Sequence, residues 1–147
     1  MTTIAENGNV LITTAPPSYF SHFSLCRWPA KSNDFCLLYA SEKAIYLLSP
    51  DGRVVCNLDA PYSSQSIATI GTAVKLIKGK PDYFAVMATP LMFKRSLLYV
   101  YDSTGKLVYQ EVMPVQGAAL TAGPSGSIGT QALYLGGEGE VLKYIAH

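Results

Sequence analysis

Short apolar segments separated by turn residues run along most of the chain. Residues 44–48 and 97–101 are strings of aliphatic and aromatic residues, and a polar turn with a glycine follows each of them. The 12 glycines and 9 prolines interrupt any helical periodicity. Short runs rich in Val, Ile, Leu and Tyr between turn signals are typical of strands. The pattern therefore predicts an all-β protein.

The turns recur with the same flanking residues. Three segments share a turn glycine, a polar residue, two apolar residues and a closing proline: 8–17, 52–61 and 105–114. Glycine accepts the positive φ that tight hairpins require. The upstream strands also align, 44–50 with 97–103, and 34–39 with 82–87 and 130–135. We therefore predict repeat units of about 45 to 50 residues, each a meander of four strands.

The boundaries of the repeat units do not coincide with the ends of the sequence. Residues 19–59 and 68–113 each supply four strands, whereas 118–145 supply three and 9–15 supply one. Terminal strands that complete one mixed blade remove an open sheet edge. Propellers close with four to eight blades, so three cannot close alone but two chains give six. We predict four-stranded antiparallel blades in a six-bladed ring, formed by a homodimer with terminal strand exchange.

One turn resembles a known repeat. Residues 100–109, with Asp102, a Thr-Gly turn, a lysine, an apolar pair and Tyr109, resemble the blade signature of PQQ-like β-propellers. The resemblance implies that Tyr109 stands where that family places a tryptophan that docks one blade onto the next. Residues 49–55 are similar to repeats of other bacterial propellers. The calcium-ligating and catalytic carboxylates of quinoproteins have no counterpart in this sequence, so no cofactor is expected.

The composition limits the classes of partner that the chain could bind. The 147 residues fit one domain, and only 14% are charged against about 25% in an average domain. This low charge favours apolar contacts between subunits. Eleven basic against ten acidic residues give no excess for nucleic acid. The N-terminus lacks a secretory signal and no apolar run reaches membrane-spanning length. We expect a cytoplasmic chain that binds neither membrane nor nucleic acid.

Residues for catalysis or metal binding do not cluster. Cys26, Cys36 and Cys56 have no metal-ligand spacing, and two of them lie in apolar strands typical of buried structural thiols. No GxSxG nucleophile motif occurs, and the glycine-rich segment 136–139 fits a hairpin turn better than a phosphate loop. Asp51 and Asp102 are expected to cap their turns. We predict no catalytic residues and no metal site.

Candidate binding residues lie mainly in the connections between strands. Polar and aromatic side chains in these connections could contact a ligand or a partner. They are His22, Arg27, Trp28, Tyr62, Gln65, Met92, Phe93, Arg95 and Gln116. Other roles stay open, since His22 fits a channel or core position and Trp28 a blade-docking position. The apolar tip at Met92 and Phe93 could equally fold over its own blade or pack in the subunit interface.

The sequence favours a non-enzymatic, self-assembling propeller module that serves as a protein-interaction or ligand-presenting scaffold. The alternative is a small-molecule or carbohydrate-binding propeller with sites at the loop face or channel mouth. An enzyme with a site across the two-fold axis is the weakest reading, because acids, bases and ligands do not cluster. The chain could also be a fragment, or an engineered half, of a longer propeller.

Overall fold

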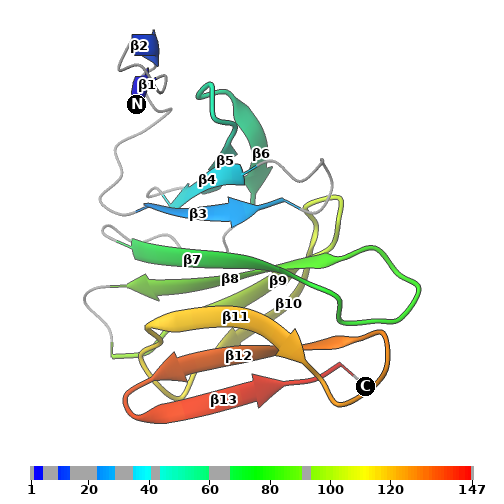
Figure 1. Cartoon of the computed structure of the whole chain (residues 1–147). Coiled ribbons are helices and arrows are strands. Elements are labelled where there is room, and N and C mark those ends of the chain that lie inside the picture. Colours follow the sequence, from blue (N-terminus) through cyan, green and yellow to red (C-terminus); the bar gives the residue numbers. More distant parts are fainter. Residues whose placement is uncertain are drawn as a thin grey trace.

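The computed structural model describes residues 2–4, 10–13, 23–28, 35–40, 44–59, 67–90 and 94–146 (Figure 1). This part of the chain forms strands and no helix, which confirms the all-β prediction. The strands are β1 (Thr2–Ile4), β2 (Val10–Thr13), β3 (Phe23–Arg27), β4 (Phe35–Ala40), β5 (Ile45–Leu48), β6 (Val54–Leu58), β7 (Ile67–Val74), β8 (Tyr83–Pro90), β9 (Leu97–Tyr101), β10 (Leu107–Val112), β11 (Ala119–Pro124), β12 (Gln131–Gly137) and β13 (Glu140–Tyr144).

The strands form three antiparallel sheets in chain order and one separate pair. The first sheet is β3-β4-β5-β6, the second is β7-β8-β9-β10, and the third is β11-β12-β13. Successive strands within each sheet pair antiparallel, as hairpin connections allow. The N-terminal strand predicted over 9–15 is present as β2, and it pairs with β1, a strand that the sequence pattern did not predict.

Two hairpin turns have the same backbone hydrogen bonds. In the first, the Ser49 amide donates to the Arg53 carbonyl at 2.9 Å and the Gly52 amide donates to the Ser49 carbonyl at 2.8 Å. In the second, Asp102 takes the place of Ser49, and Gly105 and Lys106 take those of Gly52 and Arg53. The φ angles of Gly52 and Gly105 are 84° and 89°, a conformation that glycine adopts without a Cβ clash.

Each of these turns is stabilised by one hydroxyl and one carboxylate. The hydroxyl comes first in one turn (Ser49, then Asp51), and the carboxylate comes first in the other (Asp102, then Thr104). The Asp102 carboxylate accepts from the Thr104 amide at 2.9 Å and the Thr104 hydroxyl at 2.6 Å, whereas the Ser49 hydroxyl donates to the Asp51 carboxylate. The predicted capping role of both aspartates is confirmed. These hydrogen bonds lower the pKa of each carboxyl, with the hydroxyl donor as the largest cause.

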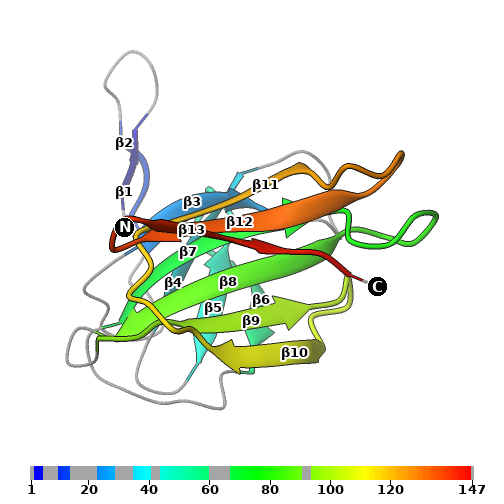
Figure 2. The ribbon, with the colours of Figure 1, turned by 90° about the horizontal axis from the view of Figure 1, so that it is seen from below.

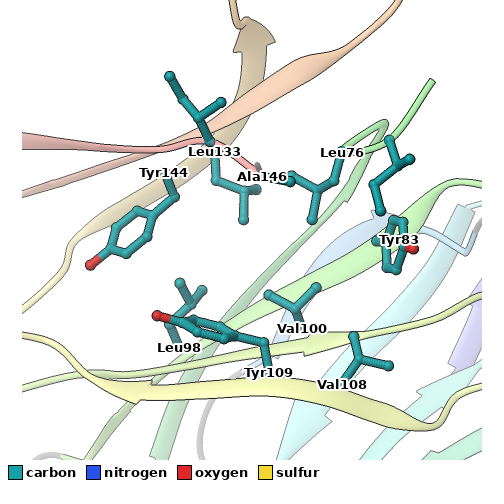
Figure 3. Close-up of a pocket in the computed structure, with 11 residues that line it drawn as sticks. Leu76, Tyr83, Leu98, Val100, Val108, Tyr109, Leu133, Tyr144 and Ala146 are labelled. Atoms are coloured by element: carbon teal, nitrogen blue, oxygen red, sulfur yellow. The ribbon is translucent and has the colours of Figure 1, made fainter.

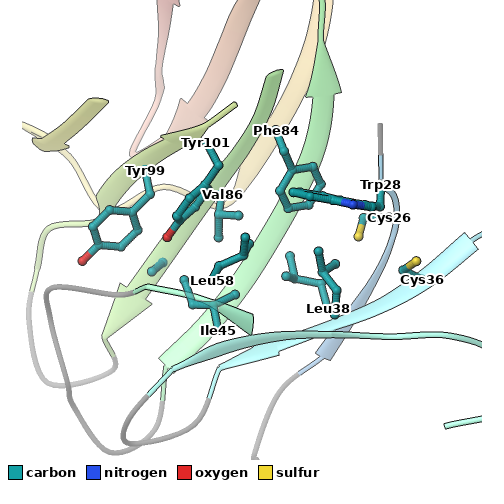
Figure 4. Close-up of a cluster of buried hydrophobic side chains, with 12 residues drawn as sticks. Cys26, Trp28, Cys36, Leu38, Ile45, Leu58, Phe84, Val86, Tyr99 and Tyr101 are labelled. Atoms are coloured by element: carbon teal, nitrogen blue, oxygen red, sulfur yellow. The ribbon is translucent and has the colours of Figure 1, made fainter. Parts of the chain in front are cut away.

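The sheets pack face to face, and their first strands lie beside one another. β3 contacts β7, and β7 contacts β11, while the later strands of each sheet extend outward from this line (Figures 1 and 2). The core between the first and second sheets joins alternate side chains of both, because side chains of one strand point to opposite faces (Figure 4). Within it, Trp28 meets the ring of Phe84 edge to face, with centroids 5.2 Å apart.

A second core lies between the second and third sheets. Met87, Leu98 and Val100 of the second sheet pack there against Leu133 and Leu135 of the third. The connection between these sheets is tied back to the second: the Ser96 hydroxyl accepts from the Gly117 amide at 2.8 Å, and the Met113 amide donates to the Ser96 carbonyl at 2.7 Å. These bonds fix where the third sheet begins.

Candidate interaction site at an open sheet edge

Within the described residues, the third sheet has three strands, whereas the other two sheets have four. β6 and β10 are the fourth strands of the first and second sheets, whereas the third sheet ends at β13 within the described residues. The outward side of β13 therefore presents backbone amide and carbonyl groups that no described strand pairs. Such an edge is a ready template for another strand.

A cavity lies beside this edge, between the second and third sheets (Figure 3). Its volume is about 420 Å³. Leu98, Val100, Val108 and Tyr109 line it from the second sheet, and Leu133 and Tyr144 line it from the third. Figure 2 shows that β9 and β10 extend beyond β13. The cavity is thus a mostly apolar space at the place where no described residues form a fourth strand.

The corresponding space between the first and second sheets is filled. There the turn before β10 covers the end of the first sheet: a Cβ on Gly105 would lie 3.1 Å from Cys56 Sγ and 3.4 Å from Leu58 Cδ2. Leu107, which follows this turn, packs against the same core. Leu58 is consequently fully buried. The turn into the fourth strand of the second sheet therefore covers the outer part of the first sheet.

On β10 the equivalent side chains are left partly exposed. Tyr109 and Glu111 pair with Val100 and Leu98, as Cys56 and Leu58 pair with Leu47 and Ile45. Tyr109 is 47% exposed, although it faces the third sheet. Because the third sheet has no described strand in the position of β10, nothing covers it there.

The polar side chains that line the cavity are tyrosines, and Glu111, which does not line it, accepts from one of them. The Tyr109 hydroxyl donates to Glu111 Oε2 at 2.6 Å, and this bond raises the pKa of Tyr109 to about 12. The Tyr144 hydroxyl donates to Met113 Sδ at 3.4 Å, and burial raises the pKa of Tyr144. Both hydroxyls are therefore neutral at physiological pH. The site suits an apolar guest that brings backbone hydrogen-bonding groups.

The two outer sheets also leave apolar side chains on the faces that turn away from the second sheet. On the first sheet, Leu25 is 68% exposed and Val54 is 49% exposed. On the third sheet, Val141 is 72% exposed, and its neighbour Leu142 packs into the core. Apolar residues on uncovered sheet faces indicate contact surfaces.

The sequence-predicted binding residues divide between two ends of the sheets. Trp28 follows β3 and is 4% exposed within the first core, which supports the packing role rather than recognition, while Arg27 is exposed on β3. Arg95 and Gln116 lie at the opposite end, where the Ser96 amide donates to the Val115 carbonyl at 3.1 Å. Arg95 is exposed and Gln116 is half-buried. Among the candidates within the described residues, Arg95 and Gln116 thus lie at one end, and Arg27 and Trp28 lie at the other.

The other predicted residues lie outside the described residues. They are His22, Tyr62, Gln65, Met92 and Phe93.

The thiols occupy the core as expected. Cys26 and Cys36 are buried, directly opposite each other on β3 and β4, and Cys56 is half-buried. Burial raises the pKa of the Cys26 thiol to about 12. In the described part of the chain, no three His, Cys, Asp or Glu side chains come close enough to hold a metal. The same residues include no helix of the length and apolarity that a membrane crossing requires.

Comparisons with known proteins return no relative. No family model matches this sequence, and neither a curated protein nor a solved structure shows significant similarity to it. The candidate site therefore depends on the geometry of this chain alone.

Sequence reasoning missed the residues that line the cavity. Leu98 and Val100 look like ordinary strand residues, and Tyr109 alone was singled out, as a position that docks neighbouring blades. The available signal was the missing fourth strand, because its absence must expose whatever the preceding sheet places opposite it.

Proposed function

We propose that this chain is a self-assembling module without catalytic activity, in which two copies close a ring of six sheets and present its loops to a protein or ligand. The observation that carries the proposal is the open edge of the third sheet, with an apolar cavity beside it. A lone copy leaves this edge and this cavity exposed to water.

The arrangement of the sheets supports a β-propeller. In such rings the blades are four-stranded antiparallel sheets that pack face to face around a common axis. Here the first strands lie side by side and each sheet packs on the next, so three sheets make an arc. Two arcs joined at both ends would make six blades, within the range of four to eight that close.

The ends of the arc offer complementary surfaces for this closure. The free face of the third sheet carries Val141, and the free face of the first sheet carries Leu25 and Val54. In a two-fold dimer each such pair of faces would meet twice, burying both apolar surfaces. The partner's N-terminal segment, with the glycine-to-proline pattern of β6 and β10, would complete the third sheet by strand exchange.

The turn geometry supports the resemblance to PQQ-like repeats. Asp102, Thr104 and Gly105 form the capped turn that the repeat signature requires, and Tyr109 lies between two sheets. The resemblance remains a proposal about architecture and carries no activity or cofactor with it.

Mass measurements test this function. Light scattering on a size-exclusion peak should give about twice 15.8 kDa for the full chain. Deletion of residues 1–15 should reduce the mass toward that of one chain, because the third sheet then loses its strand. A full-length chain that is monomeric would refute the proposal.

A pair of point variants tests whether the free face of the first sheet forms the dimer interface. Leu25→Glu places a charge on the free face of the first sheet and should weaken the dimer. Ile128→Glu is the matched control, since Ile128 is 91% exposed in a loop of the third sheet. Equal masses for the two variants would show that the face around Leu25 is not an interface.

A further inference from the structure

The cavity between β10 and β13 has a definite occupant in the proposed dimer. We infer that it is the docking site for residues 8–13 of a second copy, which enter as a strand beside β13 with Val10 opposite Tyr144. This inference rests on the proposed self-assembly and adds to it the site, the segment and the register.

The register follows from the equivalence of two tyrosines. The Tyr101 hydroxyl of the second sheet donates to the Asp59 carbonyl at 2.8 Å, just beyond the fourth strand of the first sheet. The Tyr144 hydroxyl donates to Met113, just beyond the fourth strand of the second sheet. Each tyrosine thus reaches back to the segment that directly follows the fourth strand of the preceding sheet. Tyr144 occupies in the third sheet the position that Tyr101 occupies in the second.

The strand beside Tyr101 supplies the template. In the second sheet, Leu107 of β10 pairs with Tyr101 of β9. Leu107 stands two residues after Gly105, and Val10 stands two residues after Gly8. A strand placed in the same way beside β13 puts Val10 opposite Tyr144, with its side chain directed into the cavity as Leu107 is directed into the first core.

A bulge extends the register along the strand. The pairing of β10 with β9 skips Val108, so Tyr109 lies opposite Val100, and β6 skips Val55 in the same way. Transferred to the incoming strand, this bulge falls at Leu11 and brings Ile12 opposite Lys143. Both Ile12 and Lys143 would then lie on the face turned away from the second sheet.

The incoming segment has a strand edge to offer. β2 pairs with β1 along one side, with Ile12 opposite Thr3, and no strand among the described residues pairs with its other side. β2 can therefore add to β13 without giving up its partner β1. The apolar Val10 suits the aliphatic and aromatic lining of the cavity, in which no charged side chain takes part.

Disulfide trapping tests the register. The double variant Ile12→Cys with Lys143→Cys places two thiols on directly opposite residues, within reach of a disulfide. Ile12→Cys with Val141→Cys is the matched control, because Val141 is on the same face but displaced by two residues, where the separation is too long. The three single variants report any disulfide to Cys26, Cys36 or Cys56.

We expect a covalent dimer on a non-reducing gel for the Ile12–Lys143 pair and little for the Ile12–Val141 pair. If light scattering shows a dimer but the first pair does not cross-link, or the second pair cross-links better, the strand docking is refuted and self-assembly stands. A cross-link within one chain would refute a second copy as the occupant. A monomeric parent chain would refute both proposals.

A charge in the cavity gives a second readout. Val10→Asp would bury an unpaired carboxylate among apolar side chains, so it should raise the dissociation constant of the dimer by at least about tenfold. Asn9→Asp is the control, since the polar residue after the turn glycine should point away from the core. An unchanged dissociation constant for Val10→Asp would refute Val10 as the residue that fills the cavity.

Discussion

Gly137 sits where β12 passes the connection between the second and third sheets, and its substitution tests how tightly these sheets are joined. A Cβ at this position would lie 2.1 Å from the Gln116 carbonyl oxygen and 2.9 Å from Gly117 Cα. Real Cβ contacts are essentially never under 3.0 Å, so the backbone would have to move by about 1 Å. That movement is resisted, because the Gly117 amide donates to the Ser96 hydroxyl at 2.8 Å.

Gly136→Ala is the matched control for Gly137→Ala. A Cβ on Gly136 meets only the Ala119 Cβ, at 3.9 Å, which is ordinary contact. Both substitutions stiffen the unfolded chain by similar amounts, so this term cancels in the comparison. Overpacking against backbone should make Gly137→Ala less stable than the control by about 2 kcal/mol or more, which lowers the melting temperature by roughly 4–8 °C for a chain of this size.

Urea unfolding at one fixed protein concentration measures this difference, because assembly contributes to apparent stability. The buried Trp28 is the only tryptophan and reports the transition by fluorescence. Equal unfolding midpoints for the two variants would refute the close approach of β12 to residues 116–117.

Three further predictions concern the turns and the core. Asp102→Ala removes an acceptor of three hydrogen bonds and should lower the free energy of unfolding in urea by about 1–2 kcal/mol at pH 7. Folding lowers the pKa of Asp102, so this stabilisation is present above the ordinary carboxyl pKa. It should vanish as the pH falls through the pKa of the folded state. Phe84→Ala should cost about 3–5 kcal/mol and shift the Trp28 emission to the red, since Phe84 is fully buried against that indole; an unshifted emission would contradict the packing. Folding raises the pKa of Cys26 to about 12. The free energy of unfolding should therefore not change with this thiol below its unfolded pKa of about 9, and should decline above that pH. A urea midpoint that stays constant from about pH 8 to 10.5 would contradict the burial of Cys26.

The local features of this fold were predictable from sequence because their causes are local. Gly105 needs only its own missing Cβ to adopt a positive φ, and Asp102 needs only the amides two and four residues ahead to cap the turn. The hairpin at 138–139 follows the same logic, with Glu138 and Gly139 both at positive φ as a type I′ turn requires.

Whether an individual aromatic residue is buried or exposed was not predictable in this way. Tyr101 is fully buried, whereas Tyr109 is 47% exposed, although both are strand tyrosines in one sheet. The difference depends on whether a fourth strand of a neighbouring sheet stands opposite each one. Trp28 illustrates the same limit, because the sequence allowed either recognition or packing and only the position of Phe84 decides between them.

The pairing of β1 with β2 was missed for a related reason. Thr2–Ile4 is too short and too polar to stand out as a strand, and only its pairing with Val10–Thr13 defines it. Strand pairing is a property of two segments, so a pattern read along one segment does not reveal it.

The solution mass of the unaltered chain tests the central claim most directly. Light scattering on a size-exclusion peak, repeated across a tenfold dilution, should give a constant value near twice 15.8 kDa if two copies close one ring. A constant value near 15.8 kDa would contradict it, because the open edge of the third sheet would then be tolerated in water by a single chain.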